Sequence, residues 1–230
     1  MAEKRNKGTV MDIVETGDGS HTLFHPTIGE HYHSKHGALQ ESKHVFLQSG
    51  LEYLLQQNNL SSIRLLEVGF GTGLNYLITA DYCLRHALKL DYIGIERYPL
   101  SEEIILKTGN LQYVSKQVAD DFLVGYGHSK KHPAEMKHGS LYIDLSDVND
   151  FTIEEPVDLI YYDAFAAVHQ PEMWSRETLD HVCSNLKSGG VFVTYAITGN
   201  LKRIMKSLDF SIEKAPGAPG KREMLRALKN

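Results

Sequence analysis

Residues 63 to 86 run from an apolar strand pattern through a glycine-rich loop into a helical pattern. The loop, residues 67–75, reads EVGFGTGLN and has glycine at every second position from 69 to 73. Glycine adopts positive φ at little cost and lets a ligand approach the backbone, and the amides that open a helix attract an anionic group. A strand, a glycine loop and a helix in this order predict an α/β fold with a nucleotide-type binding loop.

An acidic residue ends the next apolar run, Tyr92–Glu96, about one βα unit after the glycine loop. A carboxylate at this position can accept hydrogen bonds from both hydroxyls of a ribose. A dinucleotide-binding loop would read Gly-x-Gly-x-x-Gly, which this loop does not. Its spacing, Glu-x-Gly-x-Gly-x-Gly, resembles motif I of the S-adenosylmethionine-dependent methyltransferases. The competing interpretation is a glycine-rich turn without a ligand.

The rest of the chain alternates between strand and helix patterns. Apolar runs such as residues 191–193 are typical of parallel strands that are buried on both faces. We expect seven strands, at Ile63–Val68, Tyr92–Glu96, Leu141–Asp144, Leu159–Asp163, Val191–Tyr195, Phe210–Lys214 and Glu223–Leu228. We expect helices at Ala38–Gln57, Leu74–His86, Leu100–Lys107, Pro171–Leu186 and Gly199–Leu208. The alternation predicts a Rossmann-like, doubly wound, mostly parallel sheet that binds its ligand at the carboxyl ends of the strands.

The first sixty residues precede this alternation. Strand patterns at Thr9–Glu15 and His21–Phe24 flank the turn residues Gly17–Gly19, which predicts a hairpin. We expect residues 1–60 to form a hairpin and helix addition that packs on a cofactor-binding domain at residues 61–230. A chain of 230 residues is long enough for one α/β domain with such an addition.

Charge and composition limit the classes of protein to which the chain can belong. The formal net charge of −5 argues against a protein that binds nucleic acid by bulk electrostatics. Residues 201–230 are locally basic, and residues 128–138 carry three Lys and three His in an expected surface loop. Either cluster could be solvated surface or a contact with a polyanion. No apolar run is long enough for a membrane span or a signal region, and the two cysteines lack metal-type spacing, so we expect a cytoplasmic protein without a disulfide.

Two acids stand at the ends of later strands. Asp144 ends the third strand pattern and could accept a hydrogen bond from the exocyclic amine of adenine, although it could also be a helix cap or a solvated acid. Asp163 follows the apolar run 159–162, and the aromatic residue Phe165 comes two positions later. A carboxylate there would attract a protonated amine, whose ordinary pKa is about 10.4, and align it after deprotonation. The alternative is an Asp that caps a turn.

Three histidines, His31, His33 and His36, lie close together in the sequence. Imidazoles at this spacing can bind zinc, but neither a cysteine nor a repeated carboxylate completes a recognised site nearby. We therefore expect no stable metal and assign these side chains to a substrate pocket or to the surface. Trp174, the one tryptophan, opens a predicted helix and is expected to pack rather than to stack on a base.

Six segments together resemble one particular family. They are Gly29–Ser34, Gly37–Ser42, Gly69–Asn75, Asp163–Ala166, Pro171–Trp174 and Gly220–Met224. Their combination is similar to the methyltransferase domain of the bifunctional tRNA wobble-uridine enzymes called MnmC, and it spans nearly the whole chain. The glycine loop alone occurs in many methyltransferases, whereas the Asp-Ala-Phe-Ala and Gly-Lys-Arg-Glu-Met segments are much more specific.

This resemblance implies a class I methyltransferase fold and S-adenosylmethionine as the cofactor. It implies a stand-alone N-methyltransferase that converts 5-aminomethyluridine to 5-methylaminomethyluridine at position 34 of tRNA, with the anticodon region as the partner. Asp163 would be catalytic, beside the amine. Cofactor-binding residues are expected at Glu67, Gly69, Gly71, Gly73, Asn75, Glu96, Asp144 and Asp163. Substrate-binding residues are expected at His31, His33, Glu41, Ser42, Phe165, Lys221 and Arg222, of which the last two would shape the site or approach the anticodon.

Two departures from the family pattern bear on the substrate. The bifunctional enzymes carry a second, flavin-dependent domain that prepares the amine, and we expect none within 230 residues. Residue 167 is alanine where the family pattern has proline, so the loop after Asp163 is expected to be less rigid. The residues also leave other functions open: an aminopropyltransferase of the spermidine-synthase type, a methyltransferase for a small-molecule amine or a protein, a cofactor-binding scaffold without activity, or a histidine-based metal hydrolase.

Overall fold

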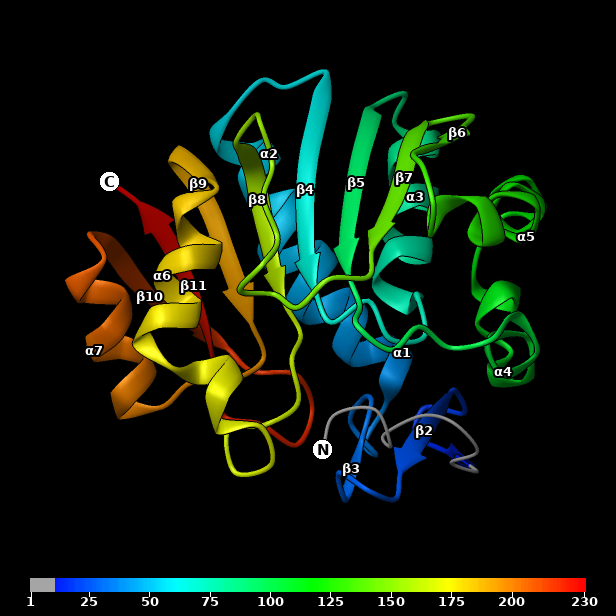
Figure 1. The fold of residues 1–230 in the computed structure, drawn as a ribbon, viewed down its shortest axis with the longest axis horizontal. Coiled ribbons are helices and arrows are strands. Elements are labelled where there is room, and N and C mark those ends of the chain that lie inside the picture. The colour runs from blue at the N-terminus through cyan, green and yellow to red at the C-terminus, as the bar shows by residue number, and fades with distance from the viewer. Residues whose placement is uncertain (1–10) are drawn as a thin grey trace.

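The computed structural model describes residues 11–230, and residues 1–10 lie outside the described part of the chain. Within that part, a sheet of three strands lies near the N-terminus, and a larger sheet of eight strands carries helices on both faces (Figure 1). The larger sheet confirms the predicted Rossmann-like, doubly wound and mostly parallel fold.

The eight-stranded sheet has the order β10-β11-β9-β8-β4-β5-β7-β6. Its strands are β4 (Ser62–Val68), β5 (Lys89–Ile95), β6 (Ala134–Met136), β7 (Gly139–Asp144), β8 (Val157–Tyr162), β9 (Leu186–Thr194), β10 (Phe210–Pro216) and β11 (Glu223–Lys229). β9, β8, β4, β5 and β7 run parallel, while β11 lies antiparallel between β9 and β10. All seven predicted strands are present, and β6 adds a short antiparallel strand at one edge. The sequence does not predict β6, because three residues in a polar segment give too short a pattern.

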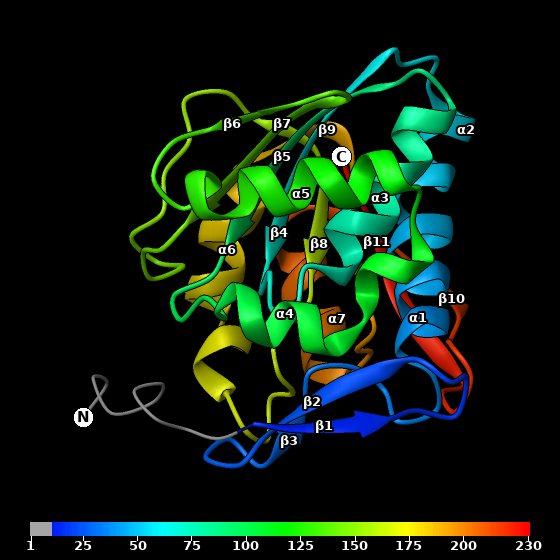
Figure 2. The same ribbon diagram turned by 90° about the vertical axis from the view of Figure 1, so that its right-hand side faces the viewer.

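Helices cover both faces of this sheet (Figures 1 and 2). α3 (Leu74–Arg85), α5 (Lys116–Ser129) and the helical segment 38–57 lie on one face, and α6 (Arg176–Ser184) and α7 (Gly199–Ser207) lie on the other. Two hydrophobic cores lie against this sheet. Tyr161 of β8 packs in one of them, and its neighbour Ile160 packs in the other. Successive strand residues point to opposite faces, so both faces of β8 are apolar. With both faces covered, the carboxyl ends of the strands are the place for a ligand.

The predicted helix Ala38–Gln57 is present over its full length but does not wind uniformly. It consists of α1 (Ala38–Glu41), the π-helix η2 (Ser42–Glu52) and α2 (Tyr53–Gln57). Gly50 of η2 faces the sheet, and a Cβ there would lie 2.9 Å from Cε1 of Tyr161. η2 begins at Ser42, directly after Glu41. Because π-helical turns are frequent at functional sites, this region is a candidate part of one.

Two other helical regions differ from expectation. The predicted helix Pro171–Leu186 is divided at Ser175 into the 3-10 helix η4 (Pro171–Trp174) and α6, because the Ser175 hydroxyl oxygen accepts the amide of Thr178 and caps α6. Between α4 (Glu102–Thr108) and α5, residues Asn110–Tyr113 form the 3-10 helix η3. α4 matches the helix predicted at Leu100–Lys107 within the usual uncertainty of helix ends.

The expectation of a basic surface loop at residues 128–138 is wrong. His128 lies in the last turn of α5, β6 follows, and His138 is buried beside Tyr76. α5 buries Val118, Phe122 and Tyr126, whose spacing of four residues places them on one face of a helix. That spacing was present in the sequence and should have predicted α5.

The N-terminal sheet consists of β1 (Asp12–Glu15), β2 (His21–His25) and β3 (Glu30–His31). The predicted hairpin is therefore present as β1 and β2, although Thr9 and Val10 lie outside the described residues, and β3 adds a third strand. This sheet lies beyond the carboxyl ends of the large sheet (Figures 1 and 2). No helix within residues 11–230 is both long and apolar enough to span a bilayer.

Candidate active site at the carboxyl ends of the strands

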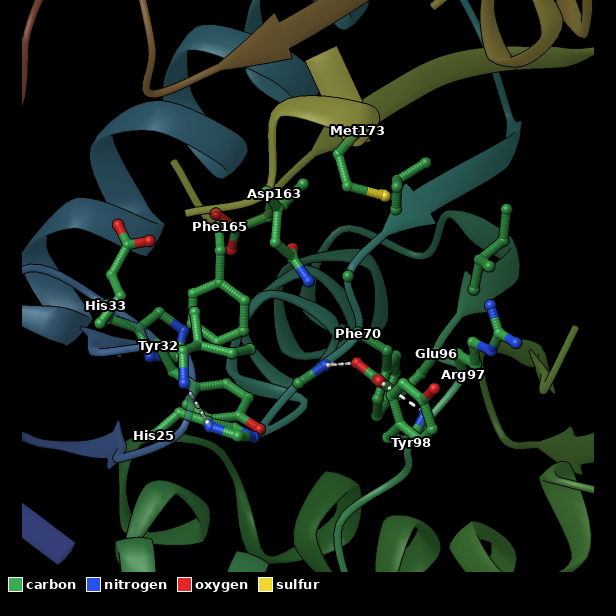
Figure 3. Close-up of a pocket in the computed structure, with 18 of the residues that line it drawn as sticks. His25, Tyr32, His33, Phe70, Glu96, Arg97, Tyr98, Asp163, Phe165 and Met173 are labelled. Atoms are coloured by element: carbon green, nitrogen blue, oxygen red, sulfur yellow. Dashed lines mark hydrogen bonds between the residues drawn. The ribbon is translucent and has the colours of Figure 1, made fainter. Parts of the chain in front are cut away.

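A cavity of about 490 Å³ lies where β4, β5 and β8 end, and residues 28–35 of the N-terminal segment form part of its wall. This volume is in the usual range for small-molecule sites. Figure 3 shows two groups of side chains that face each other across it. Glu96 and Tyr98 lie at one end, which we call the Glu96 end, and Asp163 and Phe165 lie at the other, which we call the Asp163 end.

The glycine loop gives the backbone room next to the cavity. Gly69 and Gly71, with φ of 88° and 52°, both line it, whereas Gly73 caps α3 and does not. A Cβ on Gly69 would lie 2.5 Å from the carbonyl oxygen of Asp163. The amides of Gly69 and Gly71 already donate to Ile95 O and to Glu96 Oε2. These two glycines therefore permit close approach of the strands and of a ligand rather than supplying free donors.

Glu96 follows β5, and its carboxylate accepts two backbone amides. Gly71 donates to Oε2 and Tyr98 donates to Oε1, each at 3.0 Å. Burial raises the pKa of Glu96, and the two amide hydrogen bonds act in the opposite direction. Each carboxylate oxygen has a second lone pair, so Glu96 can still accept hydrogen bonds from a ligand diol in the cavity. The amides hold the carboxylate in a fixed orientation toward it.

Apolar and charged side chains complete the Glu96 end. Val148 and Met173 also line the cavity and offer an apolar surface to a base, with Met173 drawn on the side of Asp163 in Figure 3. Arg97 forms an ion pair with Asp147, which joins the loop after β5 to the loop after β7. Asp144, expected to bind adenine, is not among the lining residues. Its Oδ1 accepts the amide of Ser146 at 2.8 Å and its Oδ2 accepts the Tyr142 hydroxyl, so it shapes the loop that carries Asp147.

Asp163 is held by a chain of buried hydrogen bonds. The side-chain amide of Asn75 donates to Asp163 Oδ2 and to Glu67 Oε1, both at 2.8 Å. Glu67 also accepts the hydroxyl of Tyr92 at 2.8 Å, and Ser42 donates to Asn75 Oδ1. Glu67, Asn75 and Ser42 are therefore buried behind Asp163 and do not line the cavity. They fix the orientation of the Asp163 carboxylate, which does line it.

The environment of Asp163 favours its neutral form. Burial and the negative charges of Glu41 and Glu30 raise the pKa of Asp163 to about 8, against the Asn75 hydrogen bond and the Lys221 charge, which lower it. Burial, together with the charge of Asp163, also raises the pKa of Glu67. A carboxyl group that titrates near neutral pH in a cavity can accept or donate a proton, which is what a general base or acid requires.

Glu41 and Lys221 form an ion pair at the Asp163 end. Lys221 Nζ lies 2.7 Å from Glu41 Oε1 and 3.9 Å from the ring centroid of Tyr195. Glu41 is 5% exposed, and its other oxygen accepts the amide of Ser34 at 2.8 Å. Lys221 therefore points into the site. Arg222, which follows it, is exposed on the turn between β10 and β11.

Aromatic rings form a second wall of the Asp163 end. The ring centroids of Tyr32 and Phe165 are 5.1 Å apart with a T-shaped geometry, and His25 lies 6.2 Å from Phe165. Figure 3 shows these three rings together beside Asp163. Such rings can contact a planar base or a cation.

The loop after Asp163 is tethered at three points, although alanine occupies position 167. Glu30 Oε2 accepts the amide of Ala166, Tyr195 donates to Ala164 O, and Trp174 Nε1 donates to Phe165 O. The distances are 2.8, 2.9 and 2.8 Å. Trp174 is buried, so its observed contacts are those of a packing residue. These tethers supply rigidity that a proline would otherwise provide.

The histidines at the mouth of the cavity differ from one another in environment. His33 is buried, and burial lowers its pKa to about 4, so it is neutral at pH 7. His31 lies against Phe24, and burial together with the charge of Lys35 lowers its pKa. Both line the cavity. Among residues 11–230, no group of three or more His, Cys, Asp or Glu side chains is arranged to hold a metal ion.

The lining residues that escaped the sequence-based assignment include Glu30, Tyr32, Asp147 and Tyr195. Glu30 and Tyr32 lie in the segment from which only the histidines His31 and His33 were assigned to the site. Tyr195 is the last residue of a predicted strand, and its place at the carboxyl end of that strand was a usable signal. Asp147 lies three residues beyond Asp144. The expectation that ligand-binding residues follow strand ends therefore located the correct loop but selected a different acid in it.

The fold and the cavity define a Rossmann-like protein that binds a nucleoside-containing cofactor at the carboxyl ends of its strands. A family model described as S-adenosyl-L-methionine-dependent methyltransferase matches residues 110–230. The chain belongs to this family of methyltransferases, and S-adenosylmethionine is its methyl donor.

Individual relatives agree with this assignment. The chain is 32% identical over 206 residues to the tRNA 5-methylaminomethyl-2-thiouridine biosynthesis bifunctional protein MnmC of Leptospira borgpetersenii serovar Hardjo-bovis, covering 84% of this chain and 31% of that protein. It is 30% identical over 214 residues to the protein of the same name from Idiomarina loihiensis, covering 86% of this chain and 35% of that protein. The chain thus spans about a third of the length of these relatives.

A solved structure has the same fold. The crystal structure of MNMC2 from Aquifex aeolicus superimposes with a TM-score of 0.78 at 24% identity, covering 97% of this chain and 72% of that one. At this identity the match supports the fold.

The cavity fits the family's methyl donor. Glu96 would present its carboxylate to the ribose diol, and Val148 and Met173 would provide an apolar surface for the base. Gly71 lines the cavity between its two ends. A Cβ at Gly71 would come within 3.0 Å of the Tyr32 ring, so a larger residue would narrow the cavity there. These residues would hold the donor, which would supply an electrophilic methyl group to the cavity.

Proposed function

We propose that this chain transfers a methyl group from S-adenosylmethionine to the primary amine of 5-aminomethyluridine at the wobble position, 34, of tRNA, which gives 5-methylaminomethyluridine. The names of the relatives support the proposal, and because the chain spans only about a third of them, it concerns the methylation step alone. The observation that carries it is the half-buried carboxylate of Asp163, across the cavity from Glu96, which would bind the ribose.

Methyl transfer to an amine requires a neutral nitrogen with a free lone pair. S-adenosylmethionine supplies an electrophilic methyl group on a positively charged sulfur. A primary amine with an ordinary pKa of about 10.4 arrives as an ammonium ion at pH 7, and ionised Asp163 can accept its proton. The nitrogen then forms a bond to the methyl carbon as the carbon–sulfur bond breaks, and the product is a secondary ammonium ion. Asp163 thus orients the nitrogen and takes its proton.

The other residues of the Asp163 end would receive the rest of the nucleoside. Phe165 and Tyr32 offer ring faces and edges to the uracil, and Glu41 and Glu30 add negative potential that attracts an ammonium group. Lys221 neutralises Glu41, so the site holds fewer net negative charges than its acids alone suggest. In our proposal, Asn75, Glu67 and Ser42 act by positioning Asp163, and His31 and His33 contact the substrate at the mouth.

The proposal is tested by methyl transfer from labelled S-adenosylmethionine to tRNA that carries 5-aminomethyluridine. The same tRNA without the amine and a polyamine are the two controls. We expect label on the amine-bearing tRNA only.

The acids Glu30 and Glu41 beside Asp163 also favour a small polyamine as a second candidate substrate, and label on the polyamine instead would replace the tRNA proposal. With tRNA as substrate, the protein would act in the cytoplasm on the anticodon region.

The rate should depend on pH through Asp163. Its carboxyl must be ionised to accept a proton, and its pKa of about 8 means that kcat/KM should rise as pH increases through this value. Glu41→Gln should shift the rise to lower pH, because the negative charge of Glu41 raises the pKa of Asp163. The ionisation of the amine is the same for both enzymes, so the difference between the two profiles reports on Asp163. Identical profiles would contradict this role.

A further inference from the structure

Charge is distributed unevenly around the cavity. Four segments each contribute at least one lining residue: 31–40, 164–171, 195–208 and 216–222. Together they contain six Lys and Arg and no Asp or Glu, which leaves 18 Lys and Arg against 29 Asp and Glu in the rest of the chain. The formal charge is thus +6 on these segments and −11 elsewhere, although the whole chain is acidic.

These segments gather on one side of the molecule. In Figure 1, the blue N-terminal sheet, the yellow loop after β8 and the red turn between β10 and β11 lie together below the carboxyl ends of the strands. The first turn of α7, with Lys202 and Arg203, follows the carboxyl end of β9 on the same side. Two of the acids that border these segments point inward, since Glu30 accepts the amide of Ala166 and Glu41 pairs with Lys221, whereas Glu172 and Asp209 are exposed.

Most of the cations in these segments have no acidic partner among residues 11–230. Within residues 11–230, nine Lys and Arg side chains form ion pairs, and of the six in these segments only Lys221 is among them. We call Lys35, Lys202, Arg203 and Arg222 the basic rim. Lys35, Arg203 and Arg222 are exposed. Unpaired cations around one cavity, on an otherwise acidic protein, attract a polyanion to that cavity and repel it elsewhere.

We propose that the basic rim binds the phosphodiester backbone on both sides of the nucleotide whose base enters the cavity. This proposal rests on the proposed function and extends it to the surface that receives the RNA. A base can reach Asp163 only if it leaves its stack, and a looped single strand permits this at low cost. The phosphates that flank such a base would then lie at the mouth, next to the rim.

The surface fits RNA better than it fits an anionic membrane. Of the large hydrophobic side chains that are exposed in residues 11–230, Val168 is the only one in the four segments. Interfacial membrane binding needs an apolar face as well as cations, and one valine does not supply it. Phosphate contacts alone need only the charges, and they make binding strongly dependent on salt.

The test compares two variants with the same change in charge. Arg203→Gln/Arg222→Gln removes two cations of the rim. Lys89→Gln/Lys137→Gln removes two cations from the amino end of the large sheet, where Lys89 opens β5 and Lys137 lies in the turn before β7. Binding of a fluorescent anticodon stem-loop RNA that lacks the amine is measured by anisotropy over a series of salt concentrations. Anionic phosphatidylglycerol vesicles are tested in parallel.

The rim variant should bind the RNA roughly tenfold more weakly, with a salt slope about 1.4 lower in magnitude, since each phosphate contact on a single strand contributes about 0.7. The control variant should match the wild type. Equal losses in both variants, an unchanged slope in the rim variant, absence of RNA binding by the wild type, or rim-dependent binding to vesicles rather than RNA would each overturn the proposal. Because this RNA lacks the amine, rim-dependent binding without methylation of amine-bearing tRNA would refute the proposed function and leave the surface standing.

Discussion

Asp163→Asn is expected to lower kcat at least ~100-fold, the usual size of the loss when a group that transfers or positions a proton is removed. Asparagine keeps the size of the side chain and can still accept the hydrogen bond from Asn75, but it cannot take a proton from the amine. The affinity for S-adenosylmethionine should stay within about twofold, because Glu96 and not Asp163 binds the ribose in our proposal. Single-turnover methyl transfer gives the rate, and isothermal titration calorimetry gives the affinity.

Asp150→Asn is the matched control for this variant. Asp150 is exposed beyond β7 and does not line the cavity, so the same chemical change there should leave both measurements at the wild-type value. If Asp163→Asn turns over within a few-fold of the wild type, Asp163 is not the proton acceptor. If the variant instead loses the cofactor, the carboxylate belongs to the cofactor site, as one of the two roles predicted from the sequence.

Glu96→Ala is expected to weaken the binding of S-adenosylmethionine more than 100-fold. In our proposal the change removes two hydrogen bonds that the ribose hydroxyls donate to a charged carboxylate, each contributing about 1.5 kcal/mol at the lower end of the range for charged groups, or about 3 kcal/mol together. It also removes the acceptor for the amides of Gly71 and Tyr98, which loosens the glycine loop. At saturating cofactor, kcat should fall less than about tenfold, since the Asp163 end is intact.

Glu103→Ala provides the comparison for the Glu96 variant. Glu103 lies on α4 and pairs with Lys107, and both side chains are largely exposed, so its loss should cost little in stability and nothing in cofactor affinity. Calorimetric titration of both variants with S-adenosylmethionine distinguishes the outcomes. An affinity of Glu96→Ala close to that of the wild type would show that the ribose is held by other groups.

Local patterns in the sequence located most of the fold. All strands of the large sheet except β6 have apolar runs long enough to recognise, and the glycine loop fixes where the first βα unit of that sheet turns. β3 and β6 are only two and three residues long, and no period can be read from so few positions. The π-helical winding of residues 42–52 is also invisible in the sequence, because it depends on how the helix packs against the sheet.

The candidate site was predictable where it is built from strand ends and not where distant segments meet. Glu96 and Asp163 follow buried strands, so their place at one edge of the sheet follows from topology alone. The sequence showed few acids near Asp163 in its own loop, yet Glu30 and Glu41 lie close to it in the structure. Their approach depends on the N-terminal segment closing over the sheet, which no local pattern encodes.

Asn75 and Lys221 show the same distinction at the level of single side chains. Their positions in the glycine loop and before the last strand suggested contact with a cofactor and with RNA. Asn75 instead bridges two carboxylates, and Lys221 pairs with Glu41 inside the site. The direction of a side chain depends on the partners that the tertiary fold brings to it, and those partners lie far away in sequence.

The ion pair between Glu41 and Lys221 also bears on how the protein folds. These residues are 180 positions apart, and the nearby contact between the His44 ring and Pro216 O spans 172 positions. Closing such large loops has a high cost in chain entropy, so these contacts form late in folding, after the local helices and hairpins. Opening of the same contacts would let water reach Asp163 and return its pKa toward that of an ordinary aspartate. The raised pKa of Asp163 is therefore acquired only in the fully assembled chain, and in partly folded forms this carboxylate should be a weaker proton acceptor.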